Sequence, residues 1–320
     1  MKVLVQTSAP PKTRRRLADV LKLKDVGASP YGSTVQKTLL ACPREYGLRY
    51  HAGLHPEFVN DALSAGWLWH YCLQRYYEEI QKAQRTSNAK QNTPEYLWGG
   101  AKAGLAAAYR VVETVESEPG YDEVAADVRR MLDQYFEVYS DRDRWRIVAV
   151  EETIIYRGVI DYSTRLDLLV EDLERGGLWI VEHKSARMVT SELLDNYQLD
   201  LQILGQVWLL KHCVDLARYP HFGGVKINIV TKHKTPQVVR IDVAPSNAHL
   251  QAFYDAQVQW KHVKGVMRTL GWPRSLGHCA GYARGYSRCQ FFDVCHGHPQ
   301  LGVVEWSSGD PPYGFLRNVP

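Results

Sequence analysis

Two short apolar segments, residues 165–170 and 179–184, constrain the fold of this chain more than any other feature. Both are rich in β-branched or large apolar side chains, and Gly176-Gly177 marks a turn between them. The first segment carries a single acidic residue, an aspartate, and the second carries Glu-x-Lys. Charge inside a sheet is costly unless it is paired, hydrogen-bonded or bound to a metal. The two segments therefore predict a β-hairpin that carries a polar site.

The charged residues of this predicted hairpin are Asp167, Glu182 and Lys184. Period-two geometry puts Glu182 and Lys184 on the same face of their strand, and pairing of the strands can bring Asp167 close to Glu182. Two carboxylates and one ammonium at one place suit metal-dependent hydrolysis of a phosphodiester. Asp161 is a rival for the first carboxylate. We favour Asp167 because its spacing to Glu182 suits a tight hairpin.

An aspartate followed, after a spacer of 14 residues, by Glu-x-Lys resembles the core motif of the PD-(D/E)XK nuclease superfamily. The run Trp-Ile-Val-Glu-His-Lys-Ser is similar to the form seen in the RecB-like exonuclease branch. Leu166 stands where many members have proline, a common departure. The resemblance implies a restriction-endonuclease-like fold of the α/β (α+β) class. This fold has a mixed central sheet with flanking helices, here with an N-terminal helical region and a C-terminal Cys-rich loop.

His70 lies in an aromatic-rich predicted helix, four residues after Gly66. This Gly-x-x-x-His spacing resembles an element that RecB-like nucleases carry upstream of the core. The resemblance implies that His70, Asp167, Glu182 and the backbone carbonyl of His183 bind a divalent metal. Imidazole with carboxylates suits Mn²⁺ and tolerates Mg²⁺.

Lys184 and a following glutamine complete the implied catalytic set. Lys184 would position or help to deprotonate the attacking water and offset charge in the transition state. The family carries a helical Gln-x-x-x-Tyr element after the Glu-x-Lys strand, where this chain has Gln198 and, in place of tyrosine, Gln202. Gln202 with Gln206 is the alternative register, since residues four apart share a helix face. We predict Gln198 as the catalytic glutamine, with Gln202 and Tyr197 as candidate DNA contacts.

Four of the six cysteines form a second candidate site. Cys42 precedes the predicted core, whereas Cys279, Cys289 and Cys295 follow it. The layout resembles the iron–sulfur subgroup of RecB-like nucleases, similar to the CRISPR adaptation nuclease and AddAB-type nuclease domains, and implies a structural 4Fe-4S cluster. The spacing between the first two trailing cysteines is not a close match, and zinc is the less favoured occupant. Such a site would join segments more than 230 residues apart and restrict the unfolded chain.

Composition sets broad limits. A hydrophobic content of 45% and a charged content of 23% are ordinary for a globular protein. The net charge of +4 does not prove nucleic-acid binding and leaves room for a local basic channel. No stretch approaches a membrane span or a signal-peptide core, so we expect a cytoplasmic protein without membrane partners. The remaining cysteines, Cys72 and Cys213, are predicted to be buried thiols.

Local patterns divide the chain into five predicted parts. These are a basic irregular segment, a helical region with the first cysteine and His70, a nuclease core, a Cys-rich iron–sulfur loop and a tail: residues 1–32, 33–145, 146–270, 271–298 and 299–320. Helices are predicted over residues 34–40, 59–82, 96–116, 121–140, 191–213 and 244–270. Strands are predicted over residues 146–157, 165–170, 179–184, 225–231 and 237–243.

The resemblance implies a metal-dependent DNA exonuclease, a hydrolase of phosphodiester bonds in single-stranded or free-ended DNA. Two alternatives stay open: a non-catalytic DNA-binding or assembly scaffold of the same fold, and a structure- or sequence-specific endonuclease. A helicase, a recombination protein or a CRISPR-adaptation protein is a candidate partner. DNA repair and recombination are candidate pathways, and a phage is one candidate source.

Overall fold

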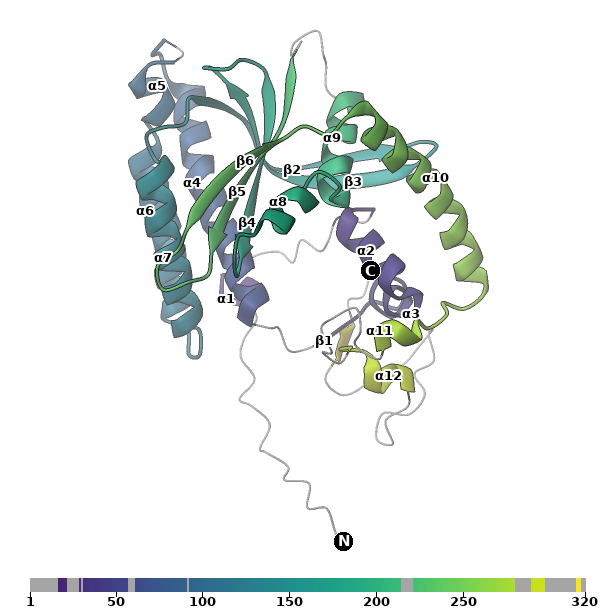
Figure 1. The fold of residues 1–320 in the computed structure, drawn as a ribbon. Coiled ribbons are helices and arrows are strands. Elements are labelled where there is room, and N and C mark those ends of the chain that lie inside the picture. Colours follow the sequence, from purple (N-terminus) through teal and green to yellow (C-terminus); the bar gives the residue numbers. More distant parts are fainter. Residues whose placement is uncertain are drawn as a thin grey trace.

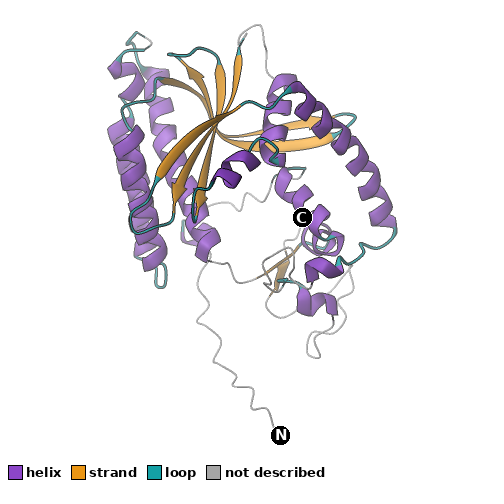
Figure 2. Ribbon diagram, in the orientation of Figure 1, coloured by secondary structure: helices purple, strands orange, loops and turns teal. Residues whose placement is uncertain are grey.

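A five-stranded mixed sheet forms the centre of the molecule, with helices on both of its faces (Figures 1 and 2). The structure is a computed structural model that describes residues 17–21, 29, 31–56, 61–90, 92–213, 221–279, 289–296 and 315–317. The strand order is β2-β3-β4-β5-β6, and β4 and β5 are the parallel pair among antiparallel neighbours. The strands are β2 (Trp145–Arg157), β3 (Asp161–Asp172), β4 (Leu178–Ala186), β5 (Phe222–Thr231) and β6 (Val238–Val243).

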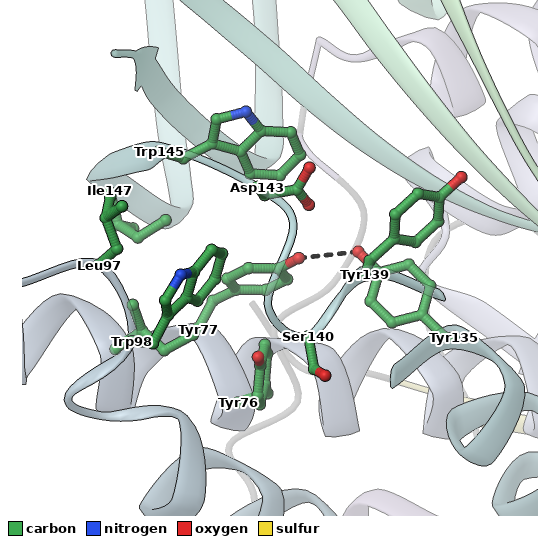
Figure 3. Close-up of a pocket in the computed structure, with 11 residues that line it drawn as sticks. Tyr76, Tyr77, Leu97, Trp98, Tyr135, Tyr139, Ser140, Asp143, Trp145 and Ile147 are labelled. Atoms are coloured by element: carbon green, nitrogen blue, oxygen red, sulfur yellow. Dashed lines mark hydrogen bonds between the residues drawn. The ribbon is translucent and has the colours of Figure 1, made fainter. Parts of the chain in front are cut away.

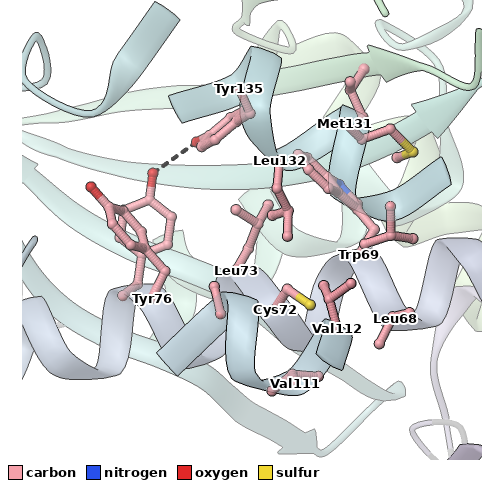
Figure 4. Close-up of a cluster of buried hydrophobic side chains, with 14 of the residues drawn as sticks. Leu68, Trp69, Cys72, Leu73, Tyr76, Val111, Val112, Met131, Leu132 and Tyr135 are labelled. Atoms are coloured by element: carbon pink, nitrogen blue, oxygen red, sulfur yellow. Dashed lines mark hydrogen bonds between the residues drawn. The ribbon is translucent and has the colours of Figure 1, made fainter. Parts of the chain in front are cut away.

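One face of the sheet is covered by two long helices from the N-terminal half of the chain, α4 (Asp61–Thr86) and α7 (Asp122–Tyr139), and a third, α6 (Ala101–Glu116), packs on both of them. Helix α4 buries an apolar stripe at helical spacing, which includes Trp69, Leu73 and Tyr76. Figure 4 shows this stripe pointing toward Val112 of α6 and Leu132 of α7. Burial of this stripe fixes α4 against the sheet and so determines where its polar residues can lie.

The opposite face is covered by α9 (Leu201–Cys213) and α10 (Asn247–Thr269), which follow α8 (Ser191–Asn196). Helix α9 is buried from Ile203 to Leu210 and packs against β3 and β5. It forms the crossover between the parallel strands β4 and β5, as such a connection requires. A helix buried on most of its circumference is held firmly in place by the core.

The predicted helix over residues 191–213 is wrong in one respect, because the structure has two helices there. Helix α8 begins at Thr190, whose side chain accepts from Leu193 N at 3.2 Å. Asp200 caps α9, with its Oδ1 accepting from Gln202 N at 2.7 Å. Side-chain caps of this kind compete with the continuous helix ladder and place a turn between the two helices.

The remaining helices and strands lie towards the two ends of the described chain, except for α5, which lies between α4 and α6. They are α1 (Leu17–Val20), α2 (Ser33–Ala41), α3 (Pro43–Tyr46), a π-helical turn (Gly47–His51), β1 (Leu54–Pro56), α5 (Pro94–Trp98), α11 (Leu276–Cys279), α12 (Phe292–His296) and β7 (Phe315–Arg317). Strands β1 and β7 pair in an antiparallel ribbon.

The prediction of two buried lone cysteines holds for Cys72 but is wrong for Cys213, which is exposed at the end of α9. None of the helices within the described ranges combines the length and apolar character that a bilayer crossing requires.

Candidate active site

The site lies at a fork in the sheet, where β3 and β4 separate. Their paired register runs from Glu171 opposite Leu178 to Leu168 opposite Val181. At the next position the Oδ2 atom of Asp167 accepts a hydrogen bond from the backbone N of His183 at 2.8 Å. A carboxylate thus takes the place of a backbone acceptor where the ladder ends. Figure 1 shows β2 and β3 continuing together toward α9 and α10 while β4 turns away.

An imidazole and a second carboxylate approach Asp167 at this fork. The Nδ1 atom of His70, from α4, lies 3.1 Å from Asp167 Oδ2. One ligand atom each of His70, Glu151 and Asp167 lies within 4.8 Å of the other two. These side chains come from α4, β2 and β3, so three separate elements bring them together. Nitrogen and oxygen donors at this separation suit the coordination of a divalent ion.

Glu151 is the member of this group that sequence reasoning missed. In the β2–β3 register Val150 pairs with Leu168 and Glu152 with Leu166, which places Glu151 opposite Asp167. The backbone of Glu151 has a φ of 50°, an uncommon value for a residue other than glycine. Its carboxylate also accepts from Arg165 Nε at 2.9 Å. The available signal was an acidic residue inside an apolar strand, the same signal that marked Asp167.

Glu182 and Lys184 form the other half of the site, on the face of β4 that is covered by α9. Lys184 Nζ lies 2.6 Å from Glu182 Oε1 and donates to Gln202 Oε1 at 2.8 Å. Gln202 Nε2 donates to Glu182 Oε1 and Gln206 Nε2 donates to Glu182 Oε2, each at 2.7 Å. Glu182 is only 1% exposed, so these donors replace the water that a carboxylate would otherwise bind.

The close approach of α9 to the sheet makes these contacts from Gln202 and Gln206 possible. Gly205 lies against Tyr162 of β3, and a Cβ atom at this position would come within 2.0 Å of the Tyr162 hydroxyl oxygen. Any larger residue would push α9 outward. The Tyr162 hydroxyl also donates to the carbonyl of Leu201 at 3.2 Å, which holds the start of α9 on β3.

Charge at the fork is distributed unevenly between Asp167 and His70. Burial would raise the pKa of Asp167, but the His70 imidazole and its hydrogen bond outweigh burial and hold that pKa well below its usual range. Burial would lower the pKa of His70, but Asp167 and Glu182 outweigh it and raise the pKa. The two shifts therefore favour the carboxylate form of Asp167 and the imidazolium form of His70.

The pKa values of the other two carboxylates, Glu151 and Glu182, are raised, whereas that of Asp167 is lowered. Burial, reinforced by the charge of Asp167, raises the pKa of Glu151 to about 7. Burial and Asp167 also raise the pKa of Glu182, against the lowering effect of Lys184 and Gln206. Burial would lower the pKa of Lys184, but Glu182 and Asp167 raise it, so Lys184 is an ammonium at neutral pH. Three crowded carboxylates of this kind favour the binding of a cation.

The side chain of His183 points to the opposite face of the sheet. Its ring stacks on Tyr77 at 5.7 Å between centroids and its Nδ1 lies 3.4 Å from Asn228 Nδ2. Burial lowers the pKa of His183 to about 3, so the ring is neutral. Tyr77 and Tyr135, joined by a 2.7 Å hydrogen bond, line a small cavity of about 10 Å³ in this layer (Figure 3). The ring anchors the strand while the backbone of His183 faces the fork.

Gln198 and Asp161, two residues that the sequence offered for the site, lie away from the carboxylates at the fork. Gln198 is exposed in the turn between α8 and α9, whereas Gln202 and Gln206 contact Glu182. The alternative register, Gln202 with Gln206, is thus the one that the geometry favours. Asp161 lies at the start of β3, about 20 Å from Asp167 by strand rise, and pairs with Lys261 at 3.4 Å. Tyr197 is buried at the end of α8, where burial, and not a charge at the fork, is the main cause of its raised pKa.

The four cysteines of the second predicted site are all buried, and none is in a disulfide. Burial raises the pKa of Cys295 to about 11, Arg44 lowers it, and the nearby thiols of Cys289, Cys279 and Cys42 raise it further. The structure therefore gathers all four thiols in one region, between α3 and the α11–α12 segment. Four buried thiols fit either an iron–sulfur cluster or zinc.

Two buried polar residues accompany these thiols. His278 Nε2 lies 2.8 Å from Glu45 Oε2, and Cys289 Sγ lies 4.0 Å from the same oxygen. Glu45 comes from α3 and His278 from α11, so this contact joins the same two segments as the cysteines. Sequence reasoning missed both residues, because neither stands at a spacing that marks a motif.

Comparison with protein families identifies the chain. The family model of the PD-(D/E)XK nuclease superfamily matches residues 33–296. The chain belongs to this superfamily. The mixed five-stranded sheet with flanking helices is the restriction-endonuclease-like fold that the sequence predicts, and this prediction is confirmed. Membership also confirms an enzyme that hydrolyses phosphodiester bonds, with DNA as its substrate.

Two solved structures are similar to the chain at low sequence identity. A protein from Eubacterium rectale named "Putative exonuclease" is 11% identical, with a TM-score of 0.42, over 84% of this chain and 93% of that chain. The crystal structure of SSO0001 is 11% identical, with a TM-score of 0.27, over 59% of this chain and 86% of that chain. Both TM-scores are low, so these likenesses carry no argument about function. A search of curated proteins found no match.

Proposed function

We propose that this nuclease is a metal-dependent exonuclease that degrades single-stranded or free-ended DNA at the fork between β3 and β4. The observation that carries the proposal is the convergence of His70, Glu151 and Asp167 within 4.8 Å. Beside them, Lys184 donates to Glu182, as a charge-stabilising lysine next to a metal site would. This arrangement favours an active enzyme over a scaffold of the same fold, because a scaffold gains nothing from crowded carboxylates.

The donor set fits a divalent cation with a preference for oxygen and imidazole ligands. His70, Glu151 and Asp167 would hold Mn²⁺ or Mg²⁺, with Glu182 and the backbone carbonyl of His183 as further ligands. The ion, when bound, supplies Lewis acidity at the phosphate and a water of lowered pKa. The raised pKa of His70 means that the imidazole must lose a proton before it can act as a ligand.

Lys184 has two conceivable roles, and its protonation favours one of them. Since its pKa is raised, Lys184 is a hydrogen-bond donor at neutral pH and a poor base. We assign it to orienting the nucleophile and offsetting negative charge on the phosphate in the transition state. Gln202 and Gln206 hold Glu182 in place, and Gln202 also bonds Lys184. In this proposal Gln202 takes the position that we predicted for Gln198.

The cysteine region is proposed to hold a structural 4Fe-4S cluster on Cys42, Cys279, Cys289 and Cys295. The four thiols are buried, lie in one region and are free of disulfides, so they are available to a group that takes the place of their protons on binding. The site joins α3 to the segment that follows α10 and lies outside the carboxylate cluster. We therefore assign it a stabilising role, with zinc as the alternative occupant. Iron content and visible absorption of anaerobically purified protein separate the two.

A cleavage assay tests the proposed function. The substrates are end-labelled linear single strands, linear duplexes and closed circles of each kind, with Mn²⁺, Mg²⁺ or EDTA. We expect metal-dependent loss of linear DNA and intact circles, and the label position gives the polarity. Cleavage of closed circles would show an endonuclease instead. No cleavage by folded, iron-loaded protein would favour the scaffold reading.

A further inference from the structure

An exposed tryptophan stacked on a partly buried tyrosine lies on α4 near His70, Glu151 and Asp167. Trp67 is 37% exposed, and its ring stacks on that of Tyr71 with centroids 5.5 Å apart and planes inclined by 17°. The two residues are four apart on one helix and so share a face. The other three Trp and Tyr side chains of α4, those of Trp69, Tyr76 and Tyr77, are buried in the core, and Figure 4 shows Trp69 and Tyr76 there. The stacked rings of Trp67 and Tyr71 thus present a flat aromatic surface to solvent.

The position of the pair relative to the fork follows from helix geometry. His70, which contacts Asp167, lies one turn from Trp67 and directly precedes Tyr71. The rise between Trp67 and His70 is only about 4.5 Å. Gly66 faces the end of β4, because a Cβ atom there would lie 3.5 Å from Ser185 Oγ. The side chain of Ser185 lies on the face of β4 opposite to that of Lys184, so the aromatic pair approaches the fork from the α4 side, beside His70.

Basic residues lie at the same edge of the sheet. Strands β4 and β5 are parallel, with Ala186 opposite Thr231, so the segment after β5 emerges beside the segment after β4. That segment is Lys232-His233-Lys234, in which His233 and Lys234 are exposed. The backbone N of Lys232 donates to the carbonyl of Ala186 at 2.9 Å, which fixes the turn to the end of β4. Lys232 Nζ would lie 3.9 Å from a Cβ atom at Gly66, next to Trp67.

We propose that Trp67, supported by Tyr71, is a stacking platform for one unpaired base of the substrate strand, while Lys232 and Lys234 contact its phosphates. This inference rests on the proposed function and deepens it, because it names the groups that select single strands. In a duplex both faces of a base are covered by its neighbours, whereas an unpaired base offers a free face to an aromatic ring. The platform would hold that base while the adjoining phosphate lies at the fork.

The test is a double-mutant cycle of DNA-binding affinities, measured with Mn²⁺. All proteins in it carry Lys184→Ala, which slows cleavage of the probe. A fluorescein-labelled single strand is compared with versions that carry an abasic nucleotide at each position in turn. In the background protein, one abasic position is expected to weaken binding about tenfold, as loss of one stacked base does. Adding Trp67→Ala should weaken binding of the intact strand by a similar factor and abolish the further effect of that abasic site. Trp67→Phe should restore most of the affinity, and Trp67→Leu should not.

Trp98→Ala is the matched control. Trp98 is half-buried at the end of α5, which packs near Ile80 of α4, about 20 Å along that helix from Trp67. We expect this variant to bind the strand as the background protein does. Thermal unfolding of each variant checks that the fold is retained. The platform would be overturned if Trp67→Ala bound the intact strand as tightly as its background protein does. It would also be overturned if the abasic nucleotide still weakened binding to the Trp67→Ala variant.

The two proposals can fail separately. If the parent enzyme degrades linear DNA but shows no coupling between Trp67 and an abasic site, the platform is wrong and the exonuclease stands. If coupling is present but the parent does not cleave, the platform stands and the exonuclease is wrong. If the background protein binds no single strand, the platform is wrong as well.

Discussion

The two candidate sites differ in what holds them together. The fork lies between the two large buried clusters of the sheet, since Leu168 belongs to one and Leu166 to the other, on either side of Asp167. The cysteine region rests on small clusters built around residues such as Leu48, Leu54 and Phe291. A site between large cores is held in place by packing, whereas a region with little core depends on its own ligands.

This difference separates chemistry from stability. At the fork, crowded carboxylates cost stability and are retained for function, as is common in active sites. Around the cysteines, the bound group would replace a missing core and tie together parts of the chain more than 230 residues apart. Substitutions at the fork should therefore change catalysis and leave the fold, whereas substitutions of the cysteines should change the fold and, through it, catalysis.

The largest expected effect is that of Asp167→Asn on cleavage. We expect a loss of about a thousandfold or more, above the 10–100-fold typical of residues that only support a metal ligand. The amide keeps the shape of the side chain but loses the charge that pairs with His70. Rates on a linear single strand with Mn²⁺ give the result, with iron content unchanged. Asp161→Asn is the control, because Asp161 pairs with Lys261 at the far end of β3, and it should keep its rate within about twofold.

Cys295→Ser is expected to affect the fold most. In the proposed cluster site, loss of one of four ligands should release the iron and lower the free energy of unfolding by on the order of 3 kcal/mol, as for loss of a cross-link over a long loop. Iron analysis and thermal unfolding under anaerobic conditions measure both effects. Cys213→Ser should change neither, since Cys213 is exposed on α9. A Cys295→Ser protein that keeps its iron and its melting temperature would remove the contrast between the two regions.

Gln206→Ala should have a smaller effect that is confined to the fork. It removes the donor to Glu182 Oε2, which leaves a buried carboxylate with one partner fewer. We expect cleavage to fall about tenfold, in line with the 1–3 kcal/mol cost of an unsatisfied buried group. Gln198→Ala serves as the comparison because Gln198 is exposed, and it should cleave at the parental rate. If Gln198→Ala instead cleaved more slowly than Gln206→Ala, Gln198 would again be the candidate catalytic glutamine.

Glu151→Gln has the smallest expected effect on the rate at saturating metal. The substitution retains the size of the side chain but removes a charged ligand, so the apparent affinity for Mn²⁺ should fall about tenfold. The dependence of cleavage on Mn²⁺ concentration measures it. Glu152→Gln changes the exposed neighbour on the same strand and should leave this dependence unaltered. Equal Mn²⁺ dependence in both variants would exclude Glu151 as a ligand.

Much of the fold could be predicted because it depends on local patterns. The strand over residues 146–157 appears as β2 (Trp145–Arg157), and the helix over residues 244–270 as α10 (Asn247–Thr269). The hairpin of β3 and β4 was visible from its apolar runs and from Gly176-Gly177, both of which have positive φ. Periodicity and turn residues are local signals. They are sufficient to predict elements, such as these, that local sequence determines.

The details of the site depend on register, which local patterns do not show. A register shift between Ile147 and Ala149 brings Glu151 opposite Asp167, and without it Glu151 would face Leu166. Similarly, the cap of Asp200 sets where α9 begins and so which glutamines face Glu182. A shift of one residue in the pairing register changes which side chains meet, and local sequence patterns do not reveal such a shift. Glu151 and Gln206 could therefore be assigned only from the three-dimensional arrangement.

The most direct test of the central claim is the rate of cleavage by Lys184→Ala under single-turnover conditions. The substrate is an end-labelled linear single strand, with saturating protein and with Mn²⁺ or EDTA. Lys184 bonds Glu182 and Gln202 and lies at the fork, outside the cysteine region. If the fork performs the chemistry, the parent cleaves only with metal, and the variant is about 10²–10³-fold slower with unchanged DNA binding and iron content. Cleavage by the variant at the parental rate would contradict the account.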